Sequence, residues 1–207
     1  MKSAYIVSGL RTAVGKAKKG GFRFVRPDDL AANVIKSLVK KTKGLEGIMV
    51  DDLIVGNAVP EAEQGMQMAR YISLLSLPKE VPGLVINRYC GSGLEAIHLA
   101  CAKINAGSAE CVIAGGTESM SMVPMTGYKS ALNYNISVNN PDYYLNMGLT
   151  AEKLAKKYDI KREDSDLFSF NSHMKATKAI EDNIFKKEIL PYDCLLYTSP
   201  SPRDVST

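Results

Sequence analysis

The segment at residues 83–106 decides the fold and reads GLVINRYCGSGLEAIHLACAKINA. Its first five residues, GLVIN, predict a short buried strand. Cys90-Gly91-Ser92-Gly93 then opens a long helix that continues to about Ala106. A buried strand that leads directly into a helix is typical of a βαβ unit, so this segment indicates an α/β fold.

Strand-like and helix-like stretches alternate on both sides of this segment. In the stretch 27–41, Leu30, Val34 and Leu38 recur at helical spacing, and Pro27 is followed by two acids at the positive end of the helix. Strands separated by helices of this length predict a mostly parallel sheet. The predicted strands are residues 4–9, 51–59, 83–87 and 110–116, and the predicted helices are 27–41, 65–75 and 90–106.

The composition and periodicity of the sequence change after Met120. Residues 121–148 are rich in Ser, Met, Asn and Tyr with little periodicity, which predicts a long loop excursion. Two helices are expected next, at 151–158 with Thr150 as its cap and at 161–180 with Leu167 and Phe168 facing inward. The last stretch, 194–207, breaks any helix or strand with Ser-Pro-Ser-Pro, and we interpret it as a non-native tail of translated vector sequence.

The composition excludes several classes of protein. With 207 residues, 45% of them hydrophobic and 23% charged, the chain is globular rather than disordered. No apolar run approaches the roughly 20 residues of a membrane helix, and no secretory signal precedes the first strand, so a cytoplasmic protein is expected. A net charge of +4 with no Trp does not favour nucleic-acid binding. Four irregularly spaced cysteines fit neither a disulfide framework nor a metal site.

Cys90 is the candidate nucleophile. A cysteine that begins a helix meets unpaired backbone N–H groups and the positive end of the helix dipole, which both favour a thiolate. Gly91 and Gly93 leave room for a carbonyl beside the sulfur, and the backbone N–H of Cys90 is placed to donate to an oxyanion on that carbonyl. The alternative is that Cys90 fills a small space in the core, which is what we expect for Cys101 in mid-helix and Cys111 in a strand.

Neither histidine is a good base for this cysteine. His98 lies eight residues along the same helix, roughly 12 Å from Cys90 at the usual rise per residue. His173 falls among polar residues on the last helix and is expected to face solvent. The base that a cysteine nucleophile requires is therefore not evident in the sequence.

Five strings of the sequence carry a family resemblance. In chain order they are SGLRTAVGK, the QG of EAEQGMQMAR, NRYCGSGLEAIHLA, AGGTESMSMVP and MGLTAEKLAKKYDIKRED. Together they resemble the amino-terminal half of a thiolase, over about residues 1–193. The resemblance implies a thiolase-like βαβαβαββ domain with a mixed, mainly parallel sheet and a loop subdomain. Residues 1–120 would be the thiolase core and 121–193 the loop region that contacts coenzyme A, with 194–207 outside it.

The resemblance also implies an acyltransferase activity. Cys90 would take the acyl group of a 3-ketoacyl-CoA, release acetyl-CoA, and pass the acyl group to a second coenzyme A, as in fatty acid beta-oxidation. Acyl-CoA and coenzyme A would be the substrates, with no other cofactor and no metal. Met147 would form part of the substrate wall, or else only pack the loop under the helix that follows. The full-length protein would be a homodimer or homotetramer.

Two alternatives to a degradative thiolase remain open. One is the biosynthetic thiolase that makes acetoacetyl-CoA, and the other is a non-catalytic thiolase-like protein that binds acyl-CoA or assembles with another chain. The family's second half supplies a histidine that activates the nucleophile, an asparagine and a histidine of an oxyanion hole, and a second cysteine. This chain lacks that half, so we expect it to be a fragment that is nearly inactive alone.

Overall fold

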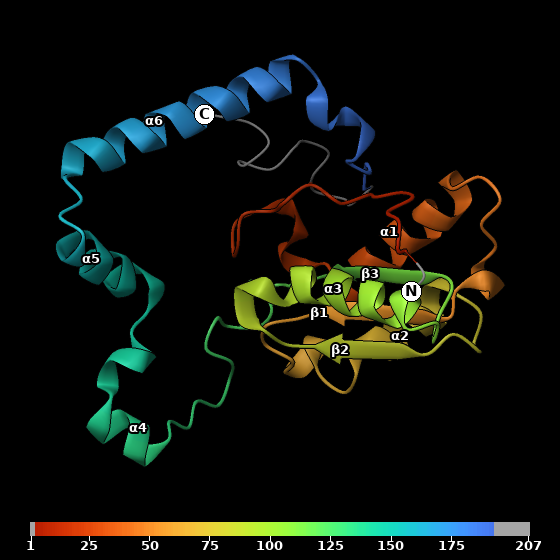
Figure 1. The fold of residues 1–207 in the computed structure, drawn as a ribbon, viewed down its shortest axis with the longest axis horizontal. Coiled ribbons are helices and arrows are strands. Elements are labelled where there is room, and N and C mark those ends of the chain that lie inside the picture. The colour runs from red at the N-terminus through yellow and green to blue at the C-terminus, as the bar shows by residue number, and fades with distance from the viewer. Residues whose placement is uncertain (1–2, 193–207) are drawn as a thin grey trace.

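The computed structural model describes residues 3–192 and contains a three-stranded parallel sheet (Figure 1). The strands are β1 (Asp52–Gly56), β2 (Gly83–Ile86) and β3 (Val112–Gly116), and their order is β2-β1-β3. Both pairings of β1 are parallel, with Leu53 opposite Gly83 on one side and Ile113 on the other. The predicted α/β class is confirmed.

Three helices cover the sheet and divide its side chains between two hydrophobic clusters. These are α1 (Pro27–Lys41), α2 (Met68–Ser76) and α3 (Ser92–Asn105). Leu53 and Val55 pack in a cluster with residues of α1 and α2, whereas Ile54 packs with residues of α3. Because successive side chains of a strand point to opposite faces, α1 and α2 cover one face of β1 and α3 covers the other.

The starts of these helices follow local backbone rules. Helix α1 has the predicted bounds, with Pro27 in its first turn and the two acids behind it. Helix α2 begins three residues later than predicted, because Met66 and Gln67 both have a positive φ that interrupts a helix. Helix α3 begins at Ser92, after a single turn of 3₁₀ helix at Tyr89–Gly91. The other 3₁₀ turns are Gly21–Phe24, Gly47–Met49, Ala62–Gln64, Pro141–Tyr144 and Ile184–Lys187.

The predicted strand at residues 4–9 is wrong for the described structure. Tyr5, Ile6 and Val7 are about 80% exposed, and within residues 3–192 they pair with no strand. A strand is stable only beside a neighbour that completes its ladder, whatever the β-propensity of its own sequence. The nearest pairing is a single bridge between Arg11 and Ile189, which ties the two ends of the described chain together.

Three further helices follow the sheet and extend away from it (Figure 1). They are α4 (Tyr134–Asn139), α5 (Met147–Lys157) and α6 (Arg162–Glu181), and none contains a buried residue. Helix α4 lies where only a loop was predicted. Helix α5 begins at 147, not 151, because the side chain of Asn146 accepts a hydrogen bond from the Leu149 N–H and caps the helix there.

Some predictions for this part are wrong and others stay predictions. Leu167 and Phe168 are 60% and 77% exposed, so they do not face inward. The domain boundaries at 120 and 193 remain predictions, and the tail at 194–207 lies outside the described residues. Among the helices of residues 3–192, none is both long and apolar enough to cross a membrane.

Candidate functional site

Cys90 lies at the predicted junction between a strand and a helix. The chain leaves β2 at Ile86, passes through the 3₁₀ turn at Tyr89–Gly91, and enters α3 at Ser92. The Cys90 side chain is exposed, and the positive end of the α3 dipole is directed toward this turn. The sulfur is therefore accessible to a substrate at the N-terminal end of α3.

The turn that carries Cys90 is held by side chains on both sides of Tyr89. Tyr89 has a φ of 45°, in the left-handed region that residues other than glycine rarely adopt. Its N–H donates to Asn87 Oδ1 at 2.8 Å, and its carbonyl accepts from Ser92 Oγ at 2.6 Å. The same Ser92 oxygen accepts from the Arg88 N–H at 2.8 Å.

A hydrogen-bonded network around Glu118 joins the carboxyl ends of β1 and β3. Glu118 Oε1 accepts from Asn57 Nδ2 at 3.1 Å and from Gln64 Nε2 at 2.6 Å, and Oε2 accepts from the Ala58 N–H at 2.7 Å. Gln64 and Asn57 are 0% and 1% exposed, and Gln64 Oε1 accepts from the Ser119 N–H. Because these buried amides are hydrogen-bonded, the loops at this edge of the sheet are fixed against one another.

The other described cysteines differ from Cys90 in their surroundings. Cys101 is half-buried in α3, and Cys111 packs against the cluster of α1 and α2. Burial raises the pKa of the Cys111 thiol, and the nearby charge of Asp51 raises it further. Both cysteines are free, and the position of Cys111 fits the packing role predicted for it, whereas the packing role of Cys101 stays a prediction.

No histidine of the described chain is placed to act as a base for Cys90. His98 is exposed on α3, and its Nδ1 is 4.0 Å from Glu95 Oε1. His173 is exposed on α6, which lies apart from α3 in Figure 1. Glu95 instead pairs with Arg88, whose Nε is 2.8 Å from its Oε2. Within residues 3–192, no group of three or more His, Cys, Asp or Glu side chains is placed to hold a metal ion.

The structure does not bring Met147 beside Cys90. Met147 is the first residue of α5 and is 67% exposed, and Figure 1 shows α5 apart from α3 and the sheet. The substrate-wall role of Met147 stays a prediction. The alternative, that Met147 packs the loop under its helix, also has no support from this exposure.

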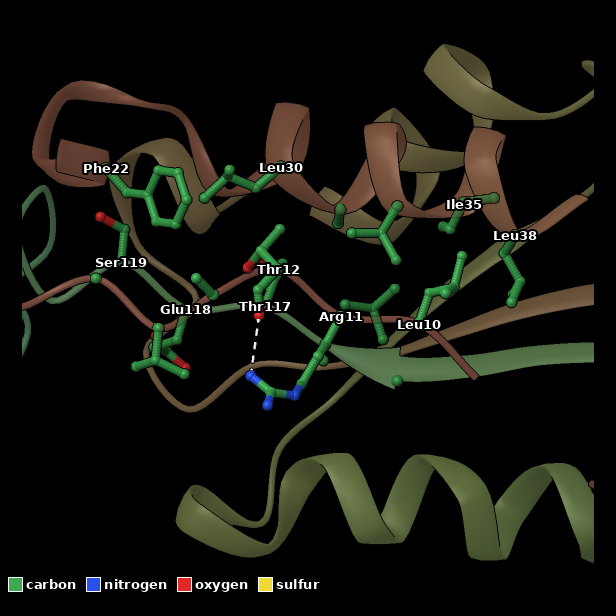
Figure 2. Close-up of a pocket in the computed structure, with 18 of the residues that line it drawn as sticks. Leu10, Arg11, Thr12, Phe22, Leu30, Ile35, Leu38, Thr117, Glu118 and Ser119 are labelled. Atoms are coloured by element: carbon green, nitrogen blue, oxygen red, sulfur yellow. Dashed lines mark hydrogen bonds between the residues drawn. The ribbon is translucent and has the colours of Figure 1, made fainter. Parts of the chain in front are cut away.

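A pocket of about 830 Å³ is lined in part by Glu118 and Ser119 of the Glu118 network (Figure 2). Residues 8–17 form one wall, and α1 and residues 113–121 form the others. Its apolar lining includes Leu10, Phe22, Leu30, Ile35 and Leu38. Cys90 does not line this pocket, so the pocket is separate from the candidate nucleophile.

Sequence reasoning missed the residues that hold the turn. Asn87 and Ser92 are short polar residues three before and two after Cys90, at a junction that must turn sharply. Side chains of this kind commonly bond to nearby backbone in turns, and that signal was present in the sequence. The contact of Asn87 with Ala58 joins residues far apart in the chain, and local sequence contains no signal for it.

Comparisons with known proteins agree with the resemblance. The profile of the thiolase N-terminal domain matches residues 4–196. The chain is 52% identical over 194 residues to the 3-ketoacyl-CoA thiolase of Bacillus subtilis, covering 93% of this chain and 49% of that protein. It is 39% identical to the 3-ketoacyl-CoA thiolase of Enterobacter sp. (strain 638) over 192 residues, which are 92% of this chain and again 49% of the relative.

The chain thus spans about half the length of the curated relatives it matches. The match includes the strand, the turn with Cys90, and the helix that together form the candidate site. A profile match over nearly the whole chain establishes the family: this chain belongs to the thiolases and corresponds to their N-terminal domain.

Proposed function

We propose that this chain carries the nucleophile of a 3-ketoacyl-CoA thiolase and that Cys90 is that nucleophile. The observation that carries the proposal is the exposed Cys90 sulfur at the head of α3, in a chain whose relatives are named 3-ketoacyl-CoA thiolase. Cys101 and Cys111, by contrast, are half-buried.

The proposed reaction has two steps. The Cys90 thiolate attacks the C3 carbonyl of a 3-ketoacyl-CoA, and the carbonyl electrons move onto oxygen, where the Cys90 N–H donates to the oxyanion. Collapse of this adduct breaks the bond between C2 and C3, and C2 takes a proton to give acetyl-CoA. The thiol of a second coenzyme A then attacks the acyl-cysteine, which releases the shortened acyl-CoA and regenerates Cys90.

The proton transfers need groups that the described residues do not place near Cys90. We propose that residues beyond this chain provide them, in the part of the thiolase sequence that the match leaves uncovered. A chain of 207 residues alone would then form the acyl-cysteine slowly and turn over poorly, because cooperating catalytic groups act as a unit. Coenzyme A thioesters are the proposed substrates, without another cofactor, and Met147 is a proposed contact for them.

The proposed setting is fatty acid beta-oxidation in the cytoplasm, in a homodimer or homotetramer of the full-length protein. Support for a reducing compartment comes from the three described cysteines, which are all free. The cleavage direction is supported by the names of the relatives alone.

Competitive alkylation of the intact chain tests the nucleophile directly. Limiting iodoacetamide at neutral pH should label Cys90 well ahead of Cys101 and Cys111, as measured by mass spectrometry of the three peptides. The Cys90→Ser variant should abolish the fast label, whereas the matched Cys101→Ser variant should leave it unchanged. Equal labelling of all three cysteines in a folded sample would contradict the proposal and favour a non-catalytic thiolase-like protein.

Acylation tests the substrate class. The chain is incubated with acetoacetyl-CoA and with longer 3-ketoacyl-CoAs, quenched in acid, and examined for an acyl group on the Cys90 peptide. Acyl groups of several lengths would support the degradative activity, whereas acylation by acetoacetyl-CoA alone would support the biosynthetic one.

A further inference from the structure

The turn that presents Cys90 is conformationally strained at Tyr89, and the exposed side chain of Tyr89 does not stabilise this conformation. Tyr89 has a φ of 45° and is 75% exposed. A residue with a side chain occupies this region only where its surroundings impose it, and such positions concentrate at functional sites. Because the tyrosine ring is mostly in solvent, the groups that impose the conformation must act on the Tyr89 backbone.

Two side chains act on that backbone from opposite sides. Asn87 Oδ1 accepts the Tyr89 N–H at 2.8 Å, and Ser92 Oγ donates to the Tyr89 carbonyl at 2.6 Å. Ser92 is 4% exposed, so water does not compete effectively for its hydroxyl. The carbonyl of Tyr89 belongs to the peptide group whose N–H is that of Cys90, so the Ser92 contact also sets the direction of the proposed oxyanion donor.

The Asn87 contact is anchored in the network at the end of the sheet. Asn87 Nδ2 donates to the Ala58 carbonyl at 2.9 Å, and the Ala58 N–H donates to Glu118 Oε2 at 2.7 Å. Glu118 is itself held by the buried amides of Asn57 and Gln64. A continuous path of hydrogen bonds therefore connects the ends of β1 and β3 with the residue that precedes Cys90.

We propose that Asn87 and Ser92 are positioning residues, which hold Tyr89 in its left-handed conformation and thereby orient the sulfur and the N–H of Cys90. This inference rests on the proposed function of Cys90. Neither side chain needs to touch the substrate. Their effect is on the geometry in which the sulfur meets a carbonyl, and small displacements of that geometry are costly in rate.

The test compares variants by the alkylation rate of Cys90, with Cys101 and Cys111 in the same molecule as internal references. Asn87→Ala and Ser92→Ala should each lower the rate at Cys90 by about tenfold and leave the other two rates unchanged. Ser92→Thr keeps the hydroxyl and should restore a rate close to that of the parent. Asn87→Asp keeps the acceptor for the Tyr89 N–H but loses the donor to Ala58, and its rate should fall between those of the parent and Asn87→Ala.

The Tyr89→Gly variant provides a second, independent test. Glycine adopts a positive φ without strain, so Asn87→Ala should lower the rate much less in a Tyr89→Gly background than in the parent. If Asn87 acted only on the overall stability, its effect would be the same in both backgrounds.

The outcomes separate the two proposals. Parent Cys90 that reacts no faster than Cys101 and Cys111 overturns the proposed function and, with it, this inference. Fast parent Cys90 with unchanged rates in Asn87→Ala and Ser92→Ala overturns the positioning role alone. Faster labelling of Cys101 and Cys111 in those two variants would show a general loosening of the fold, and it would also overturn the positioning role.

Discussion

Two regions of the molecule contain helices but differ in whether those helices pack against other elements. In the sheet unit, which we define as residues 27–120, α1, α2 and α3 all bury side chains against β1, β2 and β3. In the helical arm, residues 134–181, no residue of α4, α5 or α6 is buried. Local signals at the helix ends therefore indicate where a helix begins and ends, whereas burial requires a second surface that receives its apolar face.

Helix α6 illustrates the difference most clearly. Its large apolar residues Leu167, Phe168, Phe170 and Met174 are all more than half exposed. Helix α2 is less than half as long, yet Met68, Ala69 and Ile72 on it are 0% exposed. We therefore expect substitutions in the sheet unit to cost stability and similar substitutions in the helical arm to cost little.

Removing a side chain from the centre of the sheet should have the largest effect. Ile54 is 0% exposed between β1 and α3, so Ile54→Ala should lower the free energy of unfolding by about 4 kcal/mol. Leu167→Ala, at a position 60% exposed on α6, should change it by less than about 0.5 kcal/mol. Urea unfolding followed by circular dichroism measures both. Similar losses for the two variants would show that the helical arm is packed in solution.

Adding a single methyl group where β1 meets α3 should be nearly as damaging. A Cβ on Gly56 would lie 2.5 Å from the Ser92 carbonyl carbon and 2.7 Å from the Gly93 nitrogen, both backbone atoms that cannot rotate away. Gly56→Ala should therefore cost about 3 kcal/mol and displace the start of α3, which carries the turn of Cys90.

Gly115 on β3 provides the matched control for this substitution. A Cβ there meets no atom within 4 Å, so Gly115→Ala should leave the urea midpoint almost unchanged. Equal losses at the two glycines would contradict the close approach of β1 and α3. A selective loss of Cys90 alkylation in Gly56→Ala would connect this packing with the site.

The sequence predicted those parts of the fold that local pattern decides. The bounds of α1 follow from apolar periodicity together with Pro27 and its acids, and the structure has the same bounds. The strand predicted at residues 4–9 has an equally clear local pattern, but a strand requires a neighbour, and that requirement is not local. The start of α5 was misplaced because Asn146, rather than Thr150, supplies the capping side chain.

In the candidate site, too, features that follow a local sequence pattern were predictable, and features that depend on long-range contacts were not. Cys90 lies between a strand and a helix, as the local pattern of GLVIN followed by Cys-Gly-Ser-Gly predicts, but β2 is half-buried rather than buried and α3 begins two residues after Cys90, at Ser92. The tie from Asn87 to Ala58 and on to Glu118 was not predicted, because it depends on which loops meet at the ends of β1 and β3. Long-range polar contacts of this kind follow from the topology of the sheet.

The sheet unit and the helical arm each contain an ion pair, and the two pairs differ in burial. Asp52 is 6% exposed at the start of β1 and pairs with Lys103 of α3, whereas Arg162 and Asp166 form an exposed pair along α6 at 2.8 Å. Asp52→Asn should cost about 2 kcal/mol, because it leaves the part-buried ammonium without its partner. Asp166→Asn should produce no measurable change in the urea midpoint. A larger loss at Asp166 than at Asp52 would reverse the comparison.

The smallest expected effect is a pH dependence that originates in the sheet unit. The carboxylate of Asp51 accepts the backbone N–H groups of Glu110 and Cys111, at 2.6 and 3.0 Å, and these bonds lower its pKa. A carboxyl whose pKa is lower in the folded than in the unfolded chain stabilises the fold above the unfolded value, about pH 4, and loses that contribution as the pH falls through the folded value. Because Asp51 is mostly in solvent, the contribution is small.

The slope of stability against pH, rather than stability at neutral pH, reveals this contribution. Between pH 5 and pH 3 the urea midpoint of Asp51→Asn should fall less steeply than that of the parent, because the amide has no proton to gain. Asp166→Asn in the helical arm is the matched control, since it removes a carboxylate whose partner is Arg162 of the same helix rather than a backbone group beside β3. Parallel slopes for Asp51→Asn and the parent would mean that the bond between the starts of β1 and β3 does not depend on the Asp51 charge.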